Sequence, residues 1–188
     1  MAIEGNGPTS MPAEPKRIAI FGPESTGKTQ LAEKLAAHFK APLVAEYARE
    51  FWDRRGVITL EDIPGIAREQ WRREDELAAK ADKLLICDTE ALTTVLWSDL
   101  LYGTCSDDIR RGADQRAKHY ALYLLLDIDV PFAPDPQRCF PDPADREKCL
   151  RIWRGALERR SLSYQLIRGN WTEREAAAIA TIERLLSS

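Results

Sequence analysis

The sequence predicts an α/β fold of three layers, in which a mainly parallel sheet of five strands lies between helices. Two observations support this prediction. Five short apolar runs alternate with helical segments along the chain, and such alternation is typical of a parallel sheet covered on both faces. A glycine-containing loop at residues 22–29 joins the first run to the first helical segment. The chain has 188 residues, enough for one such domain and too few for two ordinary ones.

Five segments are expected to be strands because each is a short apolar run. They are residues 17–21, 42–45, 83–88, 121–126 and 164–167. The run at 121–126 is apolar at every position, as expected for a strand buried on both faces.

The segments between these strands carry apolar residues at helical spacing. They are residues 30–39, 46–52, 63–78, 89–101, 107–119, a segment from 143 to about 157, and 172–186. Local start signals support three of them. Thr59 and Thr172 are each followed three residues later by an acid, which predicts capping boxes. Asp142 precedes Pro143, which predicts a capped helix start.

The composition of the chain argues against some classes of binding partner. The formal net charge is −3, whereas nucleic-acid-binding domains usually carry a basic excess, so no nucleic-acid partner is expected. No apolar run approaches the ~20 residues of a membrane span, and no secretory leader is recognisable. The four cysteines show no C-x-x-C spacing and are expected to be reduced. We therefore expect no membrane partner and a cytoplasmic location, with a disordered tail at 1–15 and one domain at 16–188.

The loop after the first strand carries the clearest functional signal. It matches the phosphate-binding pattern G-x-x-x-x-G-K-[ST], between an expected strand and an expected helix. Gly22 and Gly27 allow a turn in which successive N–H groups point at phosphates, and the helix start adds the positive end of its dipole. Lys28 brings a charge to the β- and γ-phosphates, and the Thr29 hydroxyl can bind Mg²⁺. ATP is expected at eight residues: Gly22, Pro23, Glu24, Ser25, Thr26, Gly27, Lys28 and Thr29. The fold is accordingly expected to be a P-loop NTPase/kinase fold.

Ligands of parallel α/β sheets gather at the carboxyl ends of the strands. Asp88 ends the third expected strand. A carboxylate there can hold Mg²⁺ directly or through water, or accept a proton from an attacking hydroxyl. It can also cap the helix expected from Thr89, and these roles do not exclude one another.

Three polar or aromatic residues follow the second expected strand, namely Glu46, Tyr47 and Arg49. Tyr47 can stack on a flat ring, and Arg49 can pair with an anion or brace Glu46. The alternative is an ordinary helix start with a solvated arginine.

The last two candidate positions lie in a proline-rich loop and after the final strand. Arg138 precedes the helix at Pro143 within an expected lid at 131–146, from which an arginine can swing onto the γ-phosphate. The alternative is a solvated loop. Arg146 occupies a first helical turn, an unfavourable place for a cation. Asn170 and Trp171 are expected where the base of ATP would rest, although Trp171 can instead pack the last helix.

Four stretches together resemble one family: GPESTGKT, EYAREF, ICDTEALTT and DVPFAPDPQR. They are similar to the ribosylnicotinamide (nicotinamide riboside) kinase domain of NadR-type proteins, over residues 17 to about 186. The resemblance implies transfer of a phosphoryl group from ATP to nicotinamide riboside. It implies Lys28, Asp88 and Arg138 as catalytic residues and Thr29 with Asp88 at Mg²⁺. The residues implied around the nucleoside substrate are Glu46, Tyr47, Arg49, Asp88 and Glu90.

The chain also departs from the family pattern. It shows neither the adenylyltransferase signature nor the helix-turn-helix of NadR-type proteins, so a stand-alone kinase is expected. Glu90 replaces an aspartate, and Ala45 stands where some relatives have an aromatic residue. The loss of that aromatic wall is expected to weaken nicotinamide stacking by ~1 kcal/mol. The alternatives are a kinase for another nucleoside or small hydroxyl compound, and a regulatory module that binds ATP.

Overall fold

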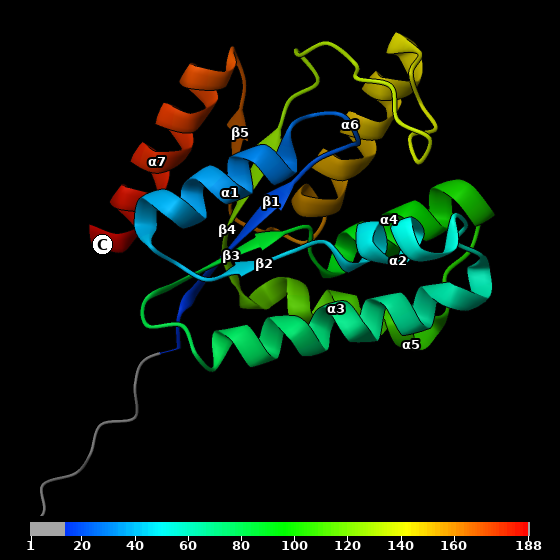
Figure 1. Cartoon of the computed structure of the whole chain (residues 1–188), viewed down its shortest axis with the longest axis horizontal. Helices are drawn as coiled ribbons and strands as arrows, with labels where there is room; N and C mark the ends of the chain where they lie inside the picture. Colours follow the sequence, from blue (N-terminus) through cyan, green and yellow to red (C-terminus); the bar gives the residue numbers. More distant parts are fainter. Residues whose placement is uncertain (1–13, 188) are drawn as a thin grey trace, which may run out of the picture.

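A computed structural model describes residues 14–187 of the chain. Residues 1–13 of the expected tail therefore lie outside the described residues, as does residue 188. The described strands are β1 (Lys16–Phe21), β2 (Leu43–Val44), β3 (Leu84–Asp88), β4 (Tyr120–Leu126) and β5 (Tyr164–Ile167). They form one sheet in the order β2-β3-β1-β4-β5, and each of its pairings is parallel (Figure 1). The predicted five-stranded sheet is confirmed.

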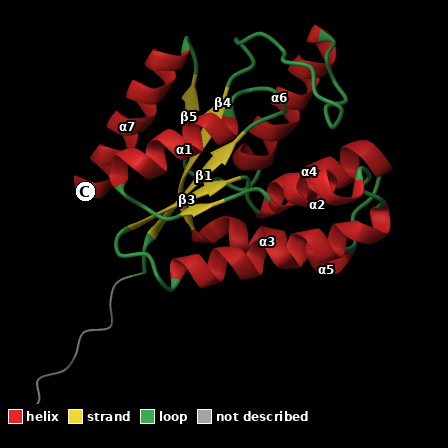
Figure 2. Cartoon of the chain, in the orientation of Figure 1, coloured by secondary structure: helices red, strands yellow, loops and turns green. Residues whose placement is uncertain are grey.

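Helices lie on both faces of this sheet. The described α-helices are α1 (Lys28–Phe39), α2 (Tyr47–Arg55), α3 (Ile63–Ala78), α4 (Ala91–Tyr102), α5 (Asp107–Arg116), α6 (Pro143–Glu158) and α7 (Trp171–Ser187). Short 3₁₀ turns occupy η1 (Leu60–Asp62) and η2 (Ala117–His119). Helices α1 and α7 cover one face, and α3 to α6 lie on the other (Figure 2). None of the helices in residues 14–187 is both long and apolar enough to cross a membrane.

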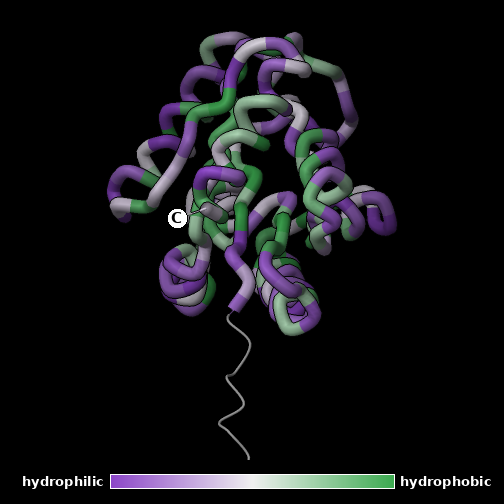
Figure 3. Tube along the Cα trace, turned by 90° about the vertical axis from the view of Figure 1, so that its left-hand side faces the viewer, coloured by the Kyte–Doolittle hydropathy of each residue, from purple (hydrophilic) through white to green (hydrophobic). Residues whose placement is uncertain are grey.

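The three layers follow from the side-chain alternation of the strands. Ile18 and Ile20 of β1 pack into the core beneath α1 and α7, whereas Ala19 and Phe21 pack into the core on the opposite face. Successive strand residues point to opposite faces, so a strand covered on both sides must be apolar throughout. Figure 3 shows this arrangement as hydrophobic segments through the middle of the molecule, with hydrophilic residues concentrated on the surrounding helices.

Two of the three predicted helix starts are confirmed. Thr59 and Asp62 form a reciprocal capping box, although a 3₁₀ turn precedes the long helix. The Asp142 carboxylate accepts a hydrogen bond from the Ala144 N–H at 2.8 Å, with Pro143 in the first turn of α6.

The capping box predicted at Thr172 is wrong. Helix α7 begins at Trp171, and the reciprocal pair is Asn170 with Glu173. The Asn170 side chain accepts from the Glu173 N–H at 3.0 Å, and the Asn170 N–H donates to the Glu173 carboxylate at 2.8 Å. Asparagine caps helices as well as threonine does, so the helix starts at the earlier of two usable signals.

Strand register brings the functional loops together. Ile20 of β1 pairs with Asp88 of β3, and Phe21 pairs with Leu125 of β4. The loop at 22–29 therefore leaves the sheet beside Asp88, at the carboxyl edge where ligands of such folds bind.

Candidate active site

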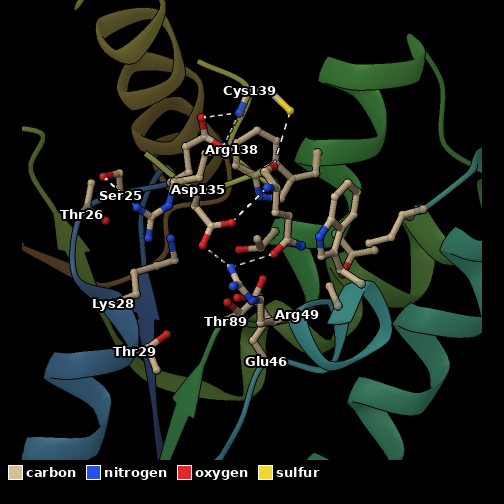
Figure 4. A pocket seen from close by; sticks show the side chains of 18 of the residues that line it. Ser25, Thr26, Lys28, Thr29, Glu46, Arg49, Thr89, Asp135, Arg138 and Cys139 are labelled. Carbon is tan, nitrogen blue, oxygen red and sulfur yellow. Dashed lines mark hydrogen bonds and ion pairs between the residues drawn. The ribbon is translucent and has the colours of Figure 1, made fainter. Parts of the chain in front are cut away.

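A cavity of about 790 Å³ opens at this edge of the sheet, a size typical of small-molecule sites. The lining includes residues 24–29, residues within 131–139 of the expected lid at 131–146, and residues of helices α2 and α4. Of the candidate residues outside the loop, those that line the cavity are Glu46, Arg49, Arg138 and Trp171. Figure 4 shows Lys28 and Thr29 across the cavity from Glu46 and Arg49, with Asp135 between them.

The phosphate loop has the backbone conformation that its glycines allow. Gly22 has a φ of +147°, and a Cβ there would lie 3.0 Å from the Leu126 carbonyl oxygen. Gly27 has a φ of +81°, and a Cβ there would overlap the Trp171 ring. Gly27 is also the N-cap of α1, and no side chain of the described residues caps that end. The first N–H groups of α1 thus remain available to an anion.

Lys28 lies folded against the loop. Its Nζ donates to the Pro23 carbonyl oxygen at 2.7 Å. Burial lowers the pKa of Lys28, and the carboxylates of Glu46, Asp88 and Glu24 oppose that shift. The Lys28 side chain therefore sits among acids whose charges favour its protonated form, next to the position that a phosphate would occupy.

Asp88 lies beside Thr29 and is only 2% exposed. Burial raises the pKa of Asp88, and the hydrogen-bonding Thr29 hydroxyl and the Lys28 ammonium oppose the rise. Within the described chain, Asp88 Oδ1 is buried without a hydrogen-bond partner. A carboxylate oxygen left unpaired in this way suits a hard cation. Thr29 and Asp88 therefore fit a Mg²⁺ site, although Asp88 is not among the residues that line the cavity.

The backbone next to Asp88 is strained. Thr89 has a φ of +76°, which is rare for a β-branched residue and costs on the order of 1–3 kcal/mol. Such strain persists only where the surrounding structure holds it. Here it turns the chain sharply after β3, so that the Thr89 side chain lines the cavity.

The structure contradicts the placement of Glu90 at the nucleoside. Glu90 is fully buried, and its carboxylate accepts from the Leu92 and Thr93 N–H groups at 2.8 and 2.9 Å. It is thus the N-cap of α4, a role considered for Asp88. Burial raises the pKa of Glu90 to about 7. The carboxylate is occupied by the helix end and does not reach the cavity.

Glu46 and Arg49 line the cavity, and their contact with the nucleoside stays a prediction. Burial raises the pKa of Glu46 to about 7, with Lys28 and Arg49 opposing the rise. The Arg49 Nη1 donates to the Asp135 carboxylate at 3.0 Å and to the Gln137 side chain at 3.2 Å. Arg49 therefore ties α2 to the lid, a contact that the sequence did not reveal.

Tyr47 does not face the cavity, contrary to the prediction that it stacks on a bound ring. Its ring lies 4.4 Å from the Arg73 guanidinium and 5.6 Å from that of Arg54. Each helical residue is rotated by about 100° from the one before it, so the side chains of Tyr47 and Arg49 point in nearly opposite directions. Because Arg49 points into the cavity, Tyr47 points towards α3.

Aromatic residues that the sequence analysis did not single out line the cavity instead. They are Trp52 of α2 with Trp97 and Tyr102 of α4. The cavity therefore has an aromatic wall to which Ala45 does not contribute, and the expected weakening of nicotinamide stacking stays a prediction. The helical spacing of these three aromatic residues is equally compatible with packing in the core. The sequence therefore does not indicate whether they lie in the core or line the cavity.

Arg138 lies at the phosphate loop. Its guanidinium is 3.4 Å from the Ser25 hydroxyl and also contacts the Ala133 carbonyl. Arg146 approaches the same loop from the first turn of α6, where its Nη2 is 3.5 Å from the Ser25 carbonyl oxygen. Two cations from the lid region thus flank the loop.

The predictions for Asn170 and Trp171 have different outcomes. Asn170 caps α7 and does not line the cavity, so its expected contact with the base of ATP is not supported. Trp171 lines the cavity with its ring against Gly27, which also fits its alternative role of packing α7.

Arg174 is a structural residue that sequence reasoning missed. It is 1% exposed and donates to the carbonyl oxygens of Thr26, Asp127 and Gly169 at 3.0, 2.9 and 2.9 Å. It also pairs with the Asp129 carboxylate. A cation near the start of α7 interacts unfavourably with the helix dipole. This unfavourable position is the one feature of the sequence that could have indicated a special role for Arg174.

These features define a class. The site combines a loop of main-chain N–H groups and a lysine with a hydroxyl–carboxylate pair and two nearby arginines. Together with a parallel sheet of this strand order, it defines a P-loop fold of the kinase type. The family model described as an AAA domain (AAA_28) matches residues 17–174, and the chain belongs to that family.

Two relatives share sequence with the chain. The trifunctional NAD biosynthesis/regulator protein NadR of Escherichia coli (strain K12) is 25% identical over 154 residues, which cover 79% of this chain and 37% of the relative. NadR of Salmonella typhimurium is 26% identical over 137 residues, covering 70% of this chain and 33% of the relative. The chain thus spans about a third of the length of these relatives. The predicted resemblance to NadR-type proteins is confirmed as homology.

Solved structures agree on the fold. A NadR protein in complex with NR has a TM-score of 0.75 at 18% identity, covering 93% of this chain and 52% of that one. Thymidylate kinase from Ehrlichia chaffeensis has a TM-score of 0.64 at 14% identity, covering 90% and 99%. The predicted P-loop kinase fold is confirmed.

Proposed function

We propose that the chain transfers the γ-phosphoryl group of ATP to the ribose 5′-hydroxyl of nicotinamide riboside. One observation supports a kinase most strongly: the phosphate loop and a pocket with carboxylate and aromatic side chains are parts of a single cavity. The name of NadR and its complex with NR support this choice of nucleoside.

The proposed chemistry is an in-line transfer. The main-chain N–H groups of the loop and Lys28 bind the triphosphate. Thr29 and Asp88 would hold Mg²⁺, which neutralises phosphate charge when bound. Arg138 moves the short distance from Ser25 to the transferred group and stabilises its charge.

Two carboxylates, of Asp88 and Glu46, have separate roles in this proposal. Asp88 lies beside the Thr29 hydroxyl, so we assign it to the metal. Glu46 lines the cavity, so we assign it to orienting the acceptor hydroxyl and accepting its proton. A pKa of about 7 for Glu46 suits a general base near neutral pH.

A panel of nucleosides tests the substrate. Purified protein with ATP and Mg²⁺ is incubated with nicotinamide riboside, thymidine, deoxyadenosine or no acceptor, and ADP release is measured. The expected result is the fastest release with nicotinamide riboside. Release no faster than without an acceptor would remove this substrate, and faster release with another nucleoside would reassign the kinase.

The aromatic wall gives a second expected result. Trp52→Ala should raise the KM for the nucleoside by about two- to tenfold, because an aromatic contact contributes roughly 0.5–1.5 kcal/mol beyond its burial. The KM for ATP should not change. Phe51→Ala is the matched control on the same helix, since Phe51 contacts Tyr47 and Arg55 outside the cavity. An equal effect of both variants would contradict the assignment of Trp52 to the acceptor.

A further inference from the structure

The phosphate loop carries an acid that is engaged by the lid. Glu24 Oε1 accepts hydrogen bonds from the Cys139 N–H at 2.9 Å and the Phe140 N–H at 2.6 Å. Glu24 Oε2 lies 3.1 Å from the same Cys139 nitrogen. Hydrogen bonds to a carboxylate are roughly twice as strong as those between neutral groups. The contact therefore fixes two consecutive residues of the lid on the phosphate loop.

A carboxylate at this position does not help to bind phosphate. The loop attracts polyanions through its N–H groups and Lys28, and a negative side chain among those groups repels the same ligand. Burial raises the pKa of Glu24, and the hydrogen bonds from the Phe140 and Cys139 N–H groups and the charges of Lys28 and Arg138 oppose that rise. The Glu24 side chain is thus better suited to hold the lid than to bind the nucleotide.

The segment held by Glu24 contacts residues that line the cavity both in the phosphate loop and in α4. Arg138 precedes the anchored Cys139 and lies against Ser25. Phe140 follows Cys139, and its ring stacks on the cavity-lining residue Trp97 with centroids 6.0 Å apart and planes 13° apart. Moving residues 139 and 140 would therefore displace Arg138 from the phosphate loop and the Phe140 ring from Trp97.

A second hydrogen bond joins the same segment to the loop. The Ala133 N–H donates to the Ser25 hydroxyl at 2.7 Å. Ser25 has a φ of +56°, an unusual conformation for a residue with a side chain. The loop thus presents an acceptor to the lid at each of two adjacent positions.

We propose that Glu24 is a positioning residue that holds the lid, and with it Arg138, against the phosphate loop. The Glu24 side chain is then not a ligand of the nucleotide, in contrast to its place among the residues expected from the loop motif to bind ATP. This inference rests on the proposed kinase function for its role in catalysis. The lid contact itself can be tested without any acceptor.

The first test is amide hydrogen exchange of the segment that contains Cys139 and Phe140, in Glu24→Ala and in the unmodified protein. Loss of the charged acceptor should speed exchange in this segment by about tenfold or more. Glu24→Gln keeps an acceptor oxygen and should lie between the two. Glu147→Ala removes an exposed acid of α6 and should change nothing. Unaltered exchange in Glu24→Ala would overturn the proposal.

The second test separates a lid contact from a nucleotide contact. Glu24→Ala should bind a non-hydrolysable ATP analogue as tightly as the unmodified protein, or more tightly because a like charge is gone. Binding weakened tenfold would make Glu24 a nucleotide ligand and overturn the proposal. With an active acceptor, kcat should fall about tenfold while the KM for ATP stays unchanged. Failure of nicotinamide riboside as substrate would remove only this last measurement.

Discussion

Replacement of Lys28 by methionine is expected to lower kcat by roughly 10²–10³-fold, as is typical when one preorganised charge or donor is lost from a transition state. The Nζ of Lys28 donates to the Pro23 carbonyl, and it is the cation of the phosphate-loop motif itself. Methionine keeps the unbranched apolar stem, so the packing of α1 should survive. Steady-state kinetics with the preferred nucleoside, together with a thermal unfolding curve, give the measurement.

The control for this variant lies on the same helix. Lys34 of α1 is exposed and pairs with Glu175 of α7, so Lys34→Met should retain full activity. Wild-type turnover by Lys28→Met would show that the loop does not act on the transferred phosphate.

Replacement of Arg174 by methionine is expected to reduce the free energy of unfolding by about 3–5 kcal/mol, the usual cost of removing one partner from a buried ionic contact. The substitution leaves the carbonyl oxygens of Thr26, Asp127 and Gly169 without their donor and the Asp129 carboxylate without its cation. Urea denaturation measures the loss. Because Thr26 belongs to the phosphate loop, binding of an ATP analogue should also weaken in the folded variant.

Arg184 offers the matched comparison for this prediction. It lies on α7 as well, but it is exposed and donates to Thr181 within the same helix. Arg184→Met should change the free energy of unfolding by no more than about 0.5 kcal/mol. Equal losses for the two variants would mean that Arg174 does not fasten α7 to the loop.

Local signals predicted the fold well because they act over a few residues. The apolar run before the glycine-containing loop has the length of a strand and is too short for a helix. Asp142 with Pro143 is a strongly preferred helix start. The error at Thr172 was a choice between two possible N-caps, Asn170 and Thr172, that lie two residues apart. Such choices depend on where the preceding strand ends.

The direction of side chains was harder to predict because it is set by contacts between distant segments. Glu90 and Asp88 are two residues apart, yet one caps a helix and the other lies at the phosphate loop. Tyr47 points towards α3 because Arg73, 26 positions later, is there to receive it. In the sequence, Trp97 has the pattern of an apolar residue in a buried helix. The residues next to it in the chain do not indicate that its side chain lines a cavity.

The most direct measurement of the central claim is the ³¹P NMR spectrum of a reaction containing the protein, ATP, Mg²⁺ and nicotinamide riboside. The γ-phosphorus signal of ATP should be replaced by equal amounts of ADP and a phosphate monoester on the ribose 5′-carbon. ADP accompanied only by inorganic phosphate would contradict the account, because a triphosphate would then be held and hydrolysed without an alcohol beside it.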